Sequence, residues 1–134
     1  MSVTHETTRD QRQHPRIKVP AMYTLIRARV LGSTRYNWTG HIYDVSLGGV
    51  RFELDMPIEP GTQLEIRGML PGSGHTTFRA VGRVARVHTD AHDQGPAIMG
   101  LAFESFQSPM DRHRLAQYID ARSKAEQSAM RRAA

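Results

Sequence analysis

Apolar and polar residues alternate along six stretches of the chain, and turn-forming residues separate each stretch from the next. A two-residue period places every second side chain on one face, as in a β strand with one buried side. The expected strands cover residues 22–31, 36–46, 49–54, 62–70, 76–88 and 97–106. In the first, the apolar side is made of Met22, Thr24, Ile26, Ala28 and Val30. Six strands without intervening helices predict an all-β domain, a small antiparallel barrel or sandwich.

A helix is expected after the last strand. Ser108 is a good N-cap, Pro109 suits the first helical position, and Asp111 complements the positive helix start. Beyond them, a narrow apolar stripe at helical spacing would pack on the strands. The stripe consists of Leu115, Tyr118, Ile119 and Arg122. From Ser123 onward the sequence is polar, and we expect the helix to fray there.

The 134 residues fit one domain with a single core. Residues 1–11 are polar and are expected to form a flexible arm, residues 12–122 the domain, and residues 123–134 a polar tail. No stretch approaches the ~18 apolar residues needed to cross a membrane, and the N-terminus lacks the apolar part of a secretory signal. The sequence therefore predicts a cytoplasmic protein without membrane insertion.

Basic residues outnumber acidic ones. Eighteen Lys and Arg against 13 Asp and Glu give a formal charge of +5. This excess favours an anionic partner: a phosphate-bearing ligand, a nucleic acid or an acidic protein surface. Proteins that bind single strands use exposed aromatic platforms, whereas the aromatic residues here fall mostly at positions assigned to the core. A nucleic-acid-binding barrel is therefore the least favoured of the functions considered, and we expect no nucleic acid partner.

Neither a metal site nor a catalytic site is indicated. His88 and His92 are four residues apart, but they lie in or beside a polar loop and not on a helix, and no His-Glu-x-x-His motif is present. Ser46 follows Asp44 by two residues, but no histidine stands at a spacing that predicts a triad. We therefore expect a protein that is not an enzyme and holds no metal or cofactor.

The segment from His41 to Leu54 reads as a strand, a tight turn and a second strand. Gly48 and Gly49 are explained by a turn with positive φ, which glycine enters at no steric cost. Asp44 and Ser46 are not explained by the turn, because residues two apart on a strand project from one face and Asp is disfavoured in strands. A carboxylate beside a hydroxyl would accept hydrogen bonds from adjacent N–H donors, such as those on the Watson–Crick edge of guanine.

Two arginines form a second candidate site near the start of the chain. Arg12 and Arg16 are four residues apart in "RQHPR", where Pro15 favours extended backbone. In an extended segment both side chains can reach one anion. Guanidinium groups bind phosphate in a bidentate manner, contact guanine O6 and N7, and stack on planar bases.

Together these motifs resemble those of the PilZ domain, the bacterial receptor module for cyclic di-GMP. The family signatures are Arg-x-x-x-Arg in the N-terminal arm and Asp/Asn-x-Ser-x-x-Gly in the barrel. They match "RQHPR" at residues 12–16 and "DVSLGG" at residues 44–49, in the family's order and separation. "IMGLAFESF" at residues 98–106 also resembles the closing barrel strand, which a terminal helix commonly follows. The resemblance spans residues 10–122.

The resemblance implies a six-stranded antiparallel PilZ-type β-barrel with the ligand on its outer surface. Arg12 and Arg16 would hold a phosphate and the guanine base, while Asp44 and Ser46 would read the guanine edge. Gly49 would hold the turn that lets the ligand approach. The ligand-binding residues implied by the resemblance are Arg12, Arg16, Asp44, Ser46, Gly48, Gly49 and Arg86. Arg86 stands where the family often has a residue that packs against the ligand, and strand alternation places Arg51 outward near Asp44.

The resemblance implies a cyclic di-GMP receptor that moves its N-terminal arm on binding and thereby regulates a protein effector in motility, biofilm or exopolysaccharide output. We expect Arg16 and Asp44 to face solvent without ligand. A PilZ-like interaction module of a pilus or flagellar apparatus that binds no nucleotide is the alternative. Many family members have another arginine before Arg-x-x-x-Arg, associated with a stacked pair of ligands. Gln11 stands there, so the number of bound molecules stays open.

Overall fold

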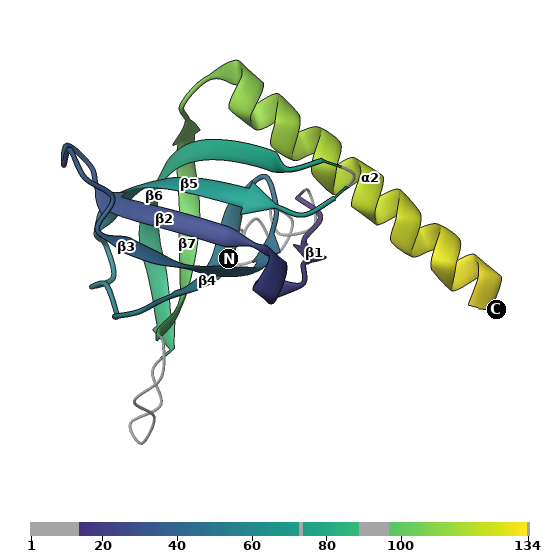
Figure 1. Cartoon of the computed structure of the whole chain (residues 1–134), viewed down its shortest axis with the longest axis horizontal. Coiled ribbons are helices and arrows are strands. Elements are labelled where there is room, and N and C mark those ends of the chain that lie inside the picture. Colours follow the sequence, from purple (N-terminus) through teal and green to yellow (C-terminus); the bar gives the residue numbers. More distant parts are fainter. Residues whose placement is uncertain (1–13, 73, 89–96, 134) are drawn as a thin grey trace, which may run out of the picture.

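The computed structural model describes residues 14–72, 74–88 and 97–133, so the expected arm at residues 1–11 lies outside the described residues. Antiparallel strands form one sheet in the described part of the chain (Figure 1). They are β1 (Ile17–Lys18), β2 (Leu25–Val30), β3 (Trp38–Val45), β4 (Gly49–Leu54), β5 (Gln63–Leu70), β6 (Thr76–His88) and β7 (Ala97–Phe106).

The sheet closes into a barrel. Its strand order is β1-β3-β2-β5-β6-β7-β4, and an additional pairing of β3 with β4 closes the six strands β2 to β7 into a ring. The barrel strands are β2 to β7, and the two-residue β1 adds an extra edge through the pairing of Ile17 with Val45. Closure leaves no free edge on the six barrel strands, which is how small all-β domains satisfy their backbone N–H and C=O groups. The prediction of a six-stranded antiparallel barrel is confirmed.

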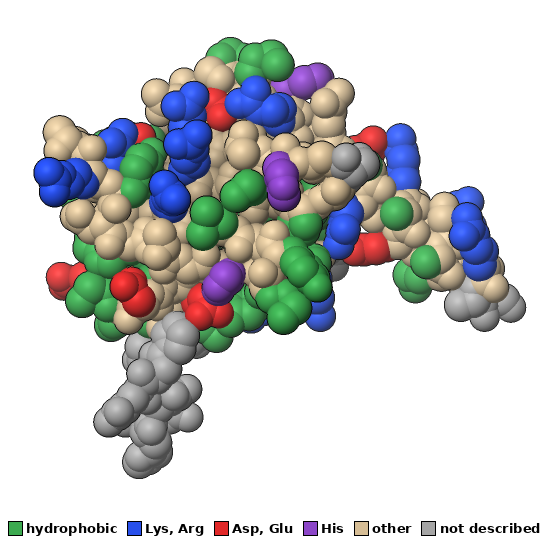
Figure 2. Space-filling model, in the orientation of Figure 1, with side chains coloured by type: hydrophobic (Ala, Val, Ile, Leu, Met, Phe, Trp, Pro, Cys, Tyr) green, Lys and Arg blue, Asp and Glu red, His purple; other side chains and the backbone are tan. Residues whose placement is uncertain are grey.

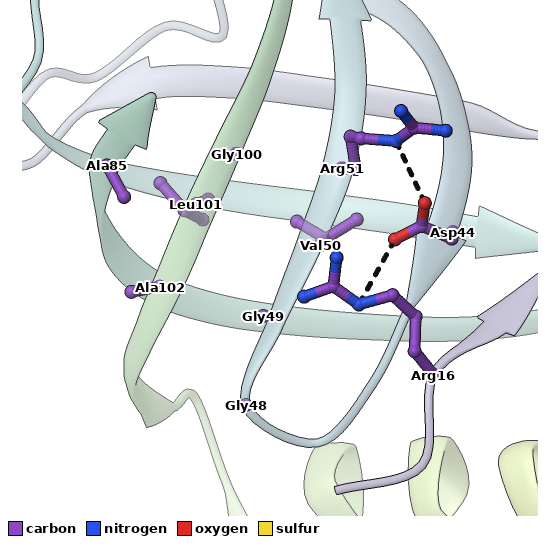
Figure 3. Close-up of a pocket in the computed structure, with 10 residues that line it drawn as sticks. All are labelled: Arg16, Asp44, Gly48, Gly49, Val50, Arg51, Ala85, Gly100, Leu101 and Ala102. Atoms are coloured by element: carbon purple, nitrogen blue, oxygen red, sulfur yellow. Dashed lines mark hydrogen bonds and ion pairs between the residues drawn. The ribbon is translucent and has the colours of Figure 1, made fainter. Parts of the chain in front are cut away.

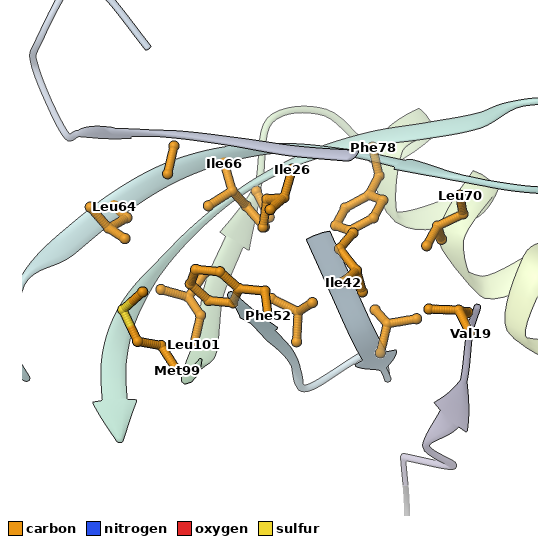
Figure 4. Packing of buried hydrophobic residues seen from close by; sticks show 14 of the residues in the cluster. Val19, Ile26, Ile42, Phe52, Leu64, Ile66, Leu70, Phe78, Met99 and Leu101 are labelled. Carbon is orange, nitrogen blue, oxygen red and sulfur yellow. The ribbon is translucent and has the colours of Figure 1, made fainter. Parts of the chain in front are cut away.

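The barrel interior is filled by the inward residues of every strand. Phe52 and Phe78 are the largest fully buried side chains, and aliphatic residues from the facing strands surround them (Figure 4). These include Ile26, Ile42, Leu54, Leu64, Ile66, Leu70 and Met99. Burying one such side chain stabilises the fold by about 1.5–3 kcal/mol. Because the interior is packed with side chains, a ligand has room only on the outer surface.

The first expected strand begins later than predicted. Residues Ala21–Tyr23 form a short 3-10 helix, η1. The backbone N–H of Thr24 and its hydroxyl both donate to the carbonyl of Ala21, at 3.0 and 2.7 Å. This turn points Met22 outward, where it is 75% exposed, and Val30 at the other strand end is 43% exposed. The prediction that these two residues belong to the buried side is wrong, whereas Ile26 and Ala28 are buried as predicted.

The C-terminal helix α2 (Pro109–Ala133) packs one stripe on the barrel and then projects beyond it (Figure 1). Leu115, Tyr118 and Ile119 are buried, as predicted. The prediction of fraying from Ser123 is wrong, because the helix continues to Ala133. Residues beyond Arg122 are mostly strong helix formers, and Lys and Arg side chains are visible along this projecting end (Figure 2). No helix in the described residues is long and apolar enough to cross a membrane.

Asp111 ties the start of α2 to the barrel. Ser108 Oγ accepts from the Asp111 N–H at 3.3 Å, and Asp111 Oδ1 accepts from the Arg79 N–H of β6 at 2.9 Å. The carboxylate, 1% exposed, also accepts from the Ser108 hydroxyl and the Arg114 guanidinium. Burial raises the pKa of Asp111, but these hydrogen bonds outweigh burial and hold its pKa below the ordinary value. The carboxylate thus joins the helix to the sheet in its charged form.

Asp111 is expected to contribute stability that depends on pH. When folding lowers the pKa of a carboxyl group, the group stabilises the folded state at pH values above its unfolded-state pKa. This stabilisation is lost as the pH falls through the folded-state pKa. Replacing Asp111 with asparagine should lower the free energy of unfolding by about 1.5–3 kcal/mol near neutral pH. The difference from the wild type should shrink below pH ~4. Urea unfolding of both proteins at several pH values measures this difference. Asp120→Asn is the control, because Asp120 lies on the same helix and its side chain is 66% exposed. A pH-independent difference would contradict this account.

Candidate functional site

A shallow hollow of about 460 Å³ lies on the outside of the barrel where β3, β4 and β7 meet (Figure 3). We call it the Asp44 hollow. Arg16, just before β1, and the β4 residue Arg51 reach toward Asp44 from two sides. The remaining wall is made of small or apolar residues. Its lining is Arg16, Asp44, Gly48, Gly49, Val50, Arg51, Ala85, Gly100, Leu101 and Ala102.

Asp44 is the buried charge of the hollow. Its Oδ2 accepts a hydrogen bond from Arg51 Nε at 2.8 Å, and its Oδ1 lies 3.5 Å from Arg16 Nε. The Asp44 side chain is only 6% exposed, whereas those of Arg16 and Arg51 are 59% and 48% exposed. The expectation that Asp44 faces solvent is therefore wrong, because the two guanidinium groups cover it. The expectation for Arg16 holds.

A β-bulge aims Asp44 at the hollow. Ile42 pairs with Phe52 of β4, and Asp44 pairs with the next residue, Arg51, so two β3 residues oppose one on β4. Without the extra residue, strict alternation would point Asp44 inward with Ile42. The bulge brings Asp44 to the outer face and returns Val45 to the core, where it is fully buried. Bulges are commonly used to re-aim a side chain beside a functional site.

Arg51 is held in place by its neighbours as well as by Asp44. Its guanidinium carbon lies 5.6 Å from the centre of the Tyr43 ring, a cation–π distance. The Tyr43 hydroxyl in turn donates to Glu53, and this hydrogen bond, with burial, raises the pKa of Tyr43. Tyr43 and Glu53 thus keep Arg51 over the carboxylate. Arg51 was predicted to lie outward near Asp44, and the structure places it there.

Ser46 forms part of the turn between β3 and β4. Its hydroxyl oxygen accepts from the N–H groups of Gly48 and Gly49, at 3.1 and 3.2 Å, and its own N–H donates to the Gly49 carbonyl at 2.9 Å. The residue is 3% exposed and does not line the hollow. Asp44 and Ser46 are therefore not side by side on one strand face, since the strand ends at Val45. The predicted contact of Ser46 with a ligand stays a prediction.

Gly48 and Gly49 are needed for close approach and not for positive φ. Among the described residues only Gly32 and Gly61 have positive φ, so the predicted conformation of the glycine pair is wrong. A Cβ on Gly49 would lie 2.4 Å from the Leu101 carbonyl oxygen of β7. A Cβ on Gly48 would lie 3.2 Å from the His14 ring. The pair lets β7 and the segment before β1 close on the turn.

Gly100 forms an open part of the hollow and was not among the predicted site residues. In the sheet register it stands between Arg51 of β4 and Arg86 of β6. A Cβ at Gly100 would meet no atom within 4 Å, unlike one at Gly49. The missing side chain leaves a flat surface between two arginine-bearing strands, beside Ala85. A glycine inside the otherwise apolar "IMGLAF" was the available sequence signal.

The structure thus brings together four of the predicted residues: Arg16, Asp44, Gly48 and Gly49. Arg12 lies outside the described residues. Arg86 is part of β6 and pairs with Gly100, but its side chain is outside the described part of the structure. No group of three or more metal-ligating side chains occurs among residues 14–72, 74–88 and 97–133.

Comparison with known proteins gives one family and several related folds. A family model described as the PilZ domain matches residues 10–121. No curated protein matches the chain. Thirteen solved chains match it in structure.

Three of the solved structures illustrate the likeness. The Bacillus subtilis inhibitor of motility, MotI/DgrA, has a TM-score of 0.65 at 18% identity over 84% of this chain and 51% of its own. Escherichia coli YcgR in complex with c-di-GMP has a TM-score of 0.64 at 17% identity, covering 92% and 51%. The K. pneumonia MrkH–c-di-GMP complex has a TM-score of 0.61 at 22% identity, covering 87% and 54%. The chain therefore spans about half the length of these three proteins, and at these identities the likeness concerns the fold.

Proposed function

The chain belongs to the PilZ domain family, and on this basis we propose that it is a non-enzymatic receptor that binds cyclic di-GMP at the Asp44 hollow. The observation that carries the proposal is the buried carboxylate of Asp44 between two arginines, beside a flat glycine-rich surface. Two solved relatives, YcgR and MrkH, are described as complexes with c-di-GMP.

The chemistry of the hollow suits a guanine nucleotide. A carboxylate accepts hydrogen bonds from the adjacent N1–H and N2–H donors of guanine. Arg16 and Arg51 can bind phosphate or stack on a base, and the open surface at Gly100 leaves space for a planar ring. Arg12 and Arg86 complete the proposed ligand-binding set, with Ser46, Gly48 and Gly49 building the turn beside it.

Ligand binding requires Arg16 to leave Asp44. Asp44 Oδ1 is buried and has no hydrogen-bond donor among the described residues, since Arg16 Nε stands at 3.5 Å as an ion-pair partner only. When the Arg16 side chain turns away, this oxygen becomes accessible to a guanine N–H. The same guanidinium is then available for a ligand phosphate. Arg16 would thus exchange one anionic partner for another.

This exchange couples the hollow to the N-terminal arm. Arg16 stands directly before β1 and four residues after Arg12. A ligand that draws both guanidinium groups to itself fixes the segment between them. We propose that this repositions the arm and alters the surface offered to a protein effector, since a ligand shifts a protein toward the conformation that it binds more tightly.

Isothermal titration with cyclic di-GMP tests the proposal. We expect saturable binding that weakens with salt, because attraction to two phosphates is screened. Arg16→Ala should weaken binding at least about tenfold through the loss of charge-assisted hydrogen bonds. Arg35→Ala, which removes an exposed arginine from the β2–β3 turn, should leave it unchanged.

Two results would contradict the proposal. No heat of binding in the wild type would leave the alternative, an interaction module that binds no nucleotide. Release of linear dinucleotide or GMP during incubation would show an enzyme where we propose a receptor.

A further inference from the structure

We propose that the outer face of β2, β5 and β6 is a docking surface for an acidic segment of a partner protein that also carries an apolar side chain. In the strand order its central strand, β5, is separated from β3 by β2 and from β7 by β6, and none of the three arginines described below lines the Asp44 hollow. The inference is independent of cyclic di-GMP binding.

Three arginines form a row across this face. Arg27 of β2 pairs with Arg67 of β5, and Arg67 pairs with Arg79 of β6. All three are exposed, and directly opposite residues on neighbouring antiparallel strands have Cβ atoms about 4.5–5.5 Å apart. Lys and Arg side chains gather over this part of the barrel (Figure 2). We call these residues the arginine row.

The arginine row has no acidic partner among the described residues. Neighbouring arginines on the same strands do: Arg29 of β2 contacts Glu65 at 2.5 Å, and Arg83 of β6 contacts Glu104 at 2.9 Å. No ion pair of this kind joins the row to a carboxylate of residues 14–72, 74–88 or 97–133. Like charges directly opposite on adjacent strands are destabilising. The stability of the fold therefore does not explain why three arginines lie directly opposite one another on neighbouring strands.

A second row, largely apolar, runs beside the arginines. Leu25 pairs with Met69, and Met69 pairs with Thr77, each two residues from an arginine of the row and therefore on the same face. With Arg27, Arg67 and Gly68 these residues line a hollow of about 260 Å³. Just before Leu25, Met22 and Tyr23 are 75% and 67% exposed. Exposed apolar groups next to arginines are typical of protein interfaces, where Arg, Met and Tyr are enriched.

This combination favours a protein partner over a polynucleotide or a membrane. The arginine row supplies the charge that acidic side chains would neutralise, in bidentate pairs with carboxylates. The adjacent apolar hollow can take one aliphatic or aromatic side chain, which a phosphate backbone does not offer. An acidic segment with one apolar anchor satisfies both rows at once.

The test is a chemical-shift titration of the full chain with a short synthetic peptide of Asp and Glu that carries one central Leu. We expect shifts at β2, β5 and β6. Arg67→Glu should weaken binding about tenfold, the effect of one lost charged contact. It should also raise the thermal midpoint by about 2–4 °C, because it places a carboxylate between Arg27 and Arg79. Arg131→Glu, in the last turn of α2, makes the same change in net charge and should leave peptide binding intact.

Several outcomes would overturn the proposal. If Arg67→Glu binds the peptide as tightly as Arg131→Glu does, the peptide does not bind at the arginine row. A lower midpoint for Arg67→Glu would show that Arg67 serves the fold. If oligo-dT or phosphatidylserine vesicles bind this face more tightly than the peptide does, the partner is a nucleic acid or a membrane and not an acidic protein segment. Cyclic di-GMP titrations of Arg67→Glu should match the wild type, so that failure of the nucleotide proposal and failure of this one are distinguishable.

Discussion

Replacing Asp44 with asparagine is expected to weaken cyclic di-GMP binding at least about a hundredfold. Two charge-assisted hydrogen bonds to guanine would be lost, each worth about 1.5–3 kcal/mol, and 1.4 kcal/mol corresponds to a factor of ten. Asparagine keeps the shape of the side chain but not its charge. It also offers an N–H₂ group toward the guanine donors, where only an acceptor fits.

The same substitution is expected to lower stability. Asp44 is 6% exposed, and its charge balances Arg16 and Arg51. Because both arginines are about half exposed, water screens them once the carboxylate is removed. We therefore expect a loss of about 1–2 kcal/mol, less than the 3–5 kcal/mol typical of a fully buried pair.

Asp55→Asn is the matched control, because Asp55 is an exposed aspartate just after β4. It should change neither the titration nor the thermal midpoint. Titrations of Asp44→Asn are run at a temperature well below its thermal midpoint, so that weak binding reflects the altered site and not unfolding of the protein. A titration curve for Asp44→Asn that overlays the wild type would disprove the assignment of Asp44.

Filling the hollow at Gly100 is expected to abolish most ligand binding without harming the fold. A Cβ there has no neighbour within 4 Å, and the backbone φ is not positive, so a side chain can start at this position without backbone strain. The side chain would occupy the space proposed for the base. Forcing a ligand against such a group costs about 1–3 kcal/mol, a weakening of roughly 10–100-fold.

A graded series makes this prediction sharper. Gly100→Ala should weaken binding less than Gly100→Leu, while thermal midpoints of both stay near the wild type. Thr39→Leu adds a similar side chain to an exposed β3 position that does not line the hollow, and should leave binding unchanged. If Gly100→Leu binds cyclic di-GMP normally, the ligand does not occupy this hollow.

Much of the fold could be predicted because the pattern is local. Alternation predicted the six barrel strands, and the Ser108–Pro109–Asp111 motif predicted the start of the helix. The errors lie at element ends. Met22 lies in η1 because hydrogen bonds from Thr24 to Ala21 form a turn that alternation does not report. The predicted end of the helix is too early because polarity after Arg122 does not report helix propensity, and most of these polar residues favour helix.

By itself, the sequence determined the barrel, the closing helix and the two motifs that mark the family. Tertiary structure decided how Asp44 is presented. A bulge opposite Arg51 turns Asp44 outward, and a guanidinium from a segment almost thirty residues earlier in the chain covers it. It also decided that Gly49 serves the approach of β7 and that Gly100 leaves the hollow open. The physical reason is that strand period and turn chemistry depend on neighbouring residues, whereas burial and ion pairing depend on which strands closure of the barrel brings together.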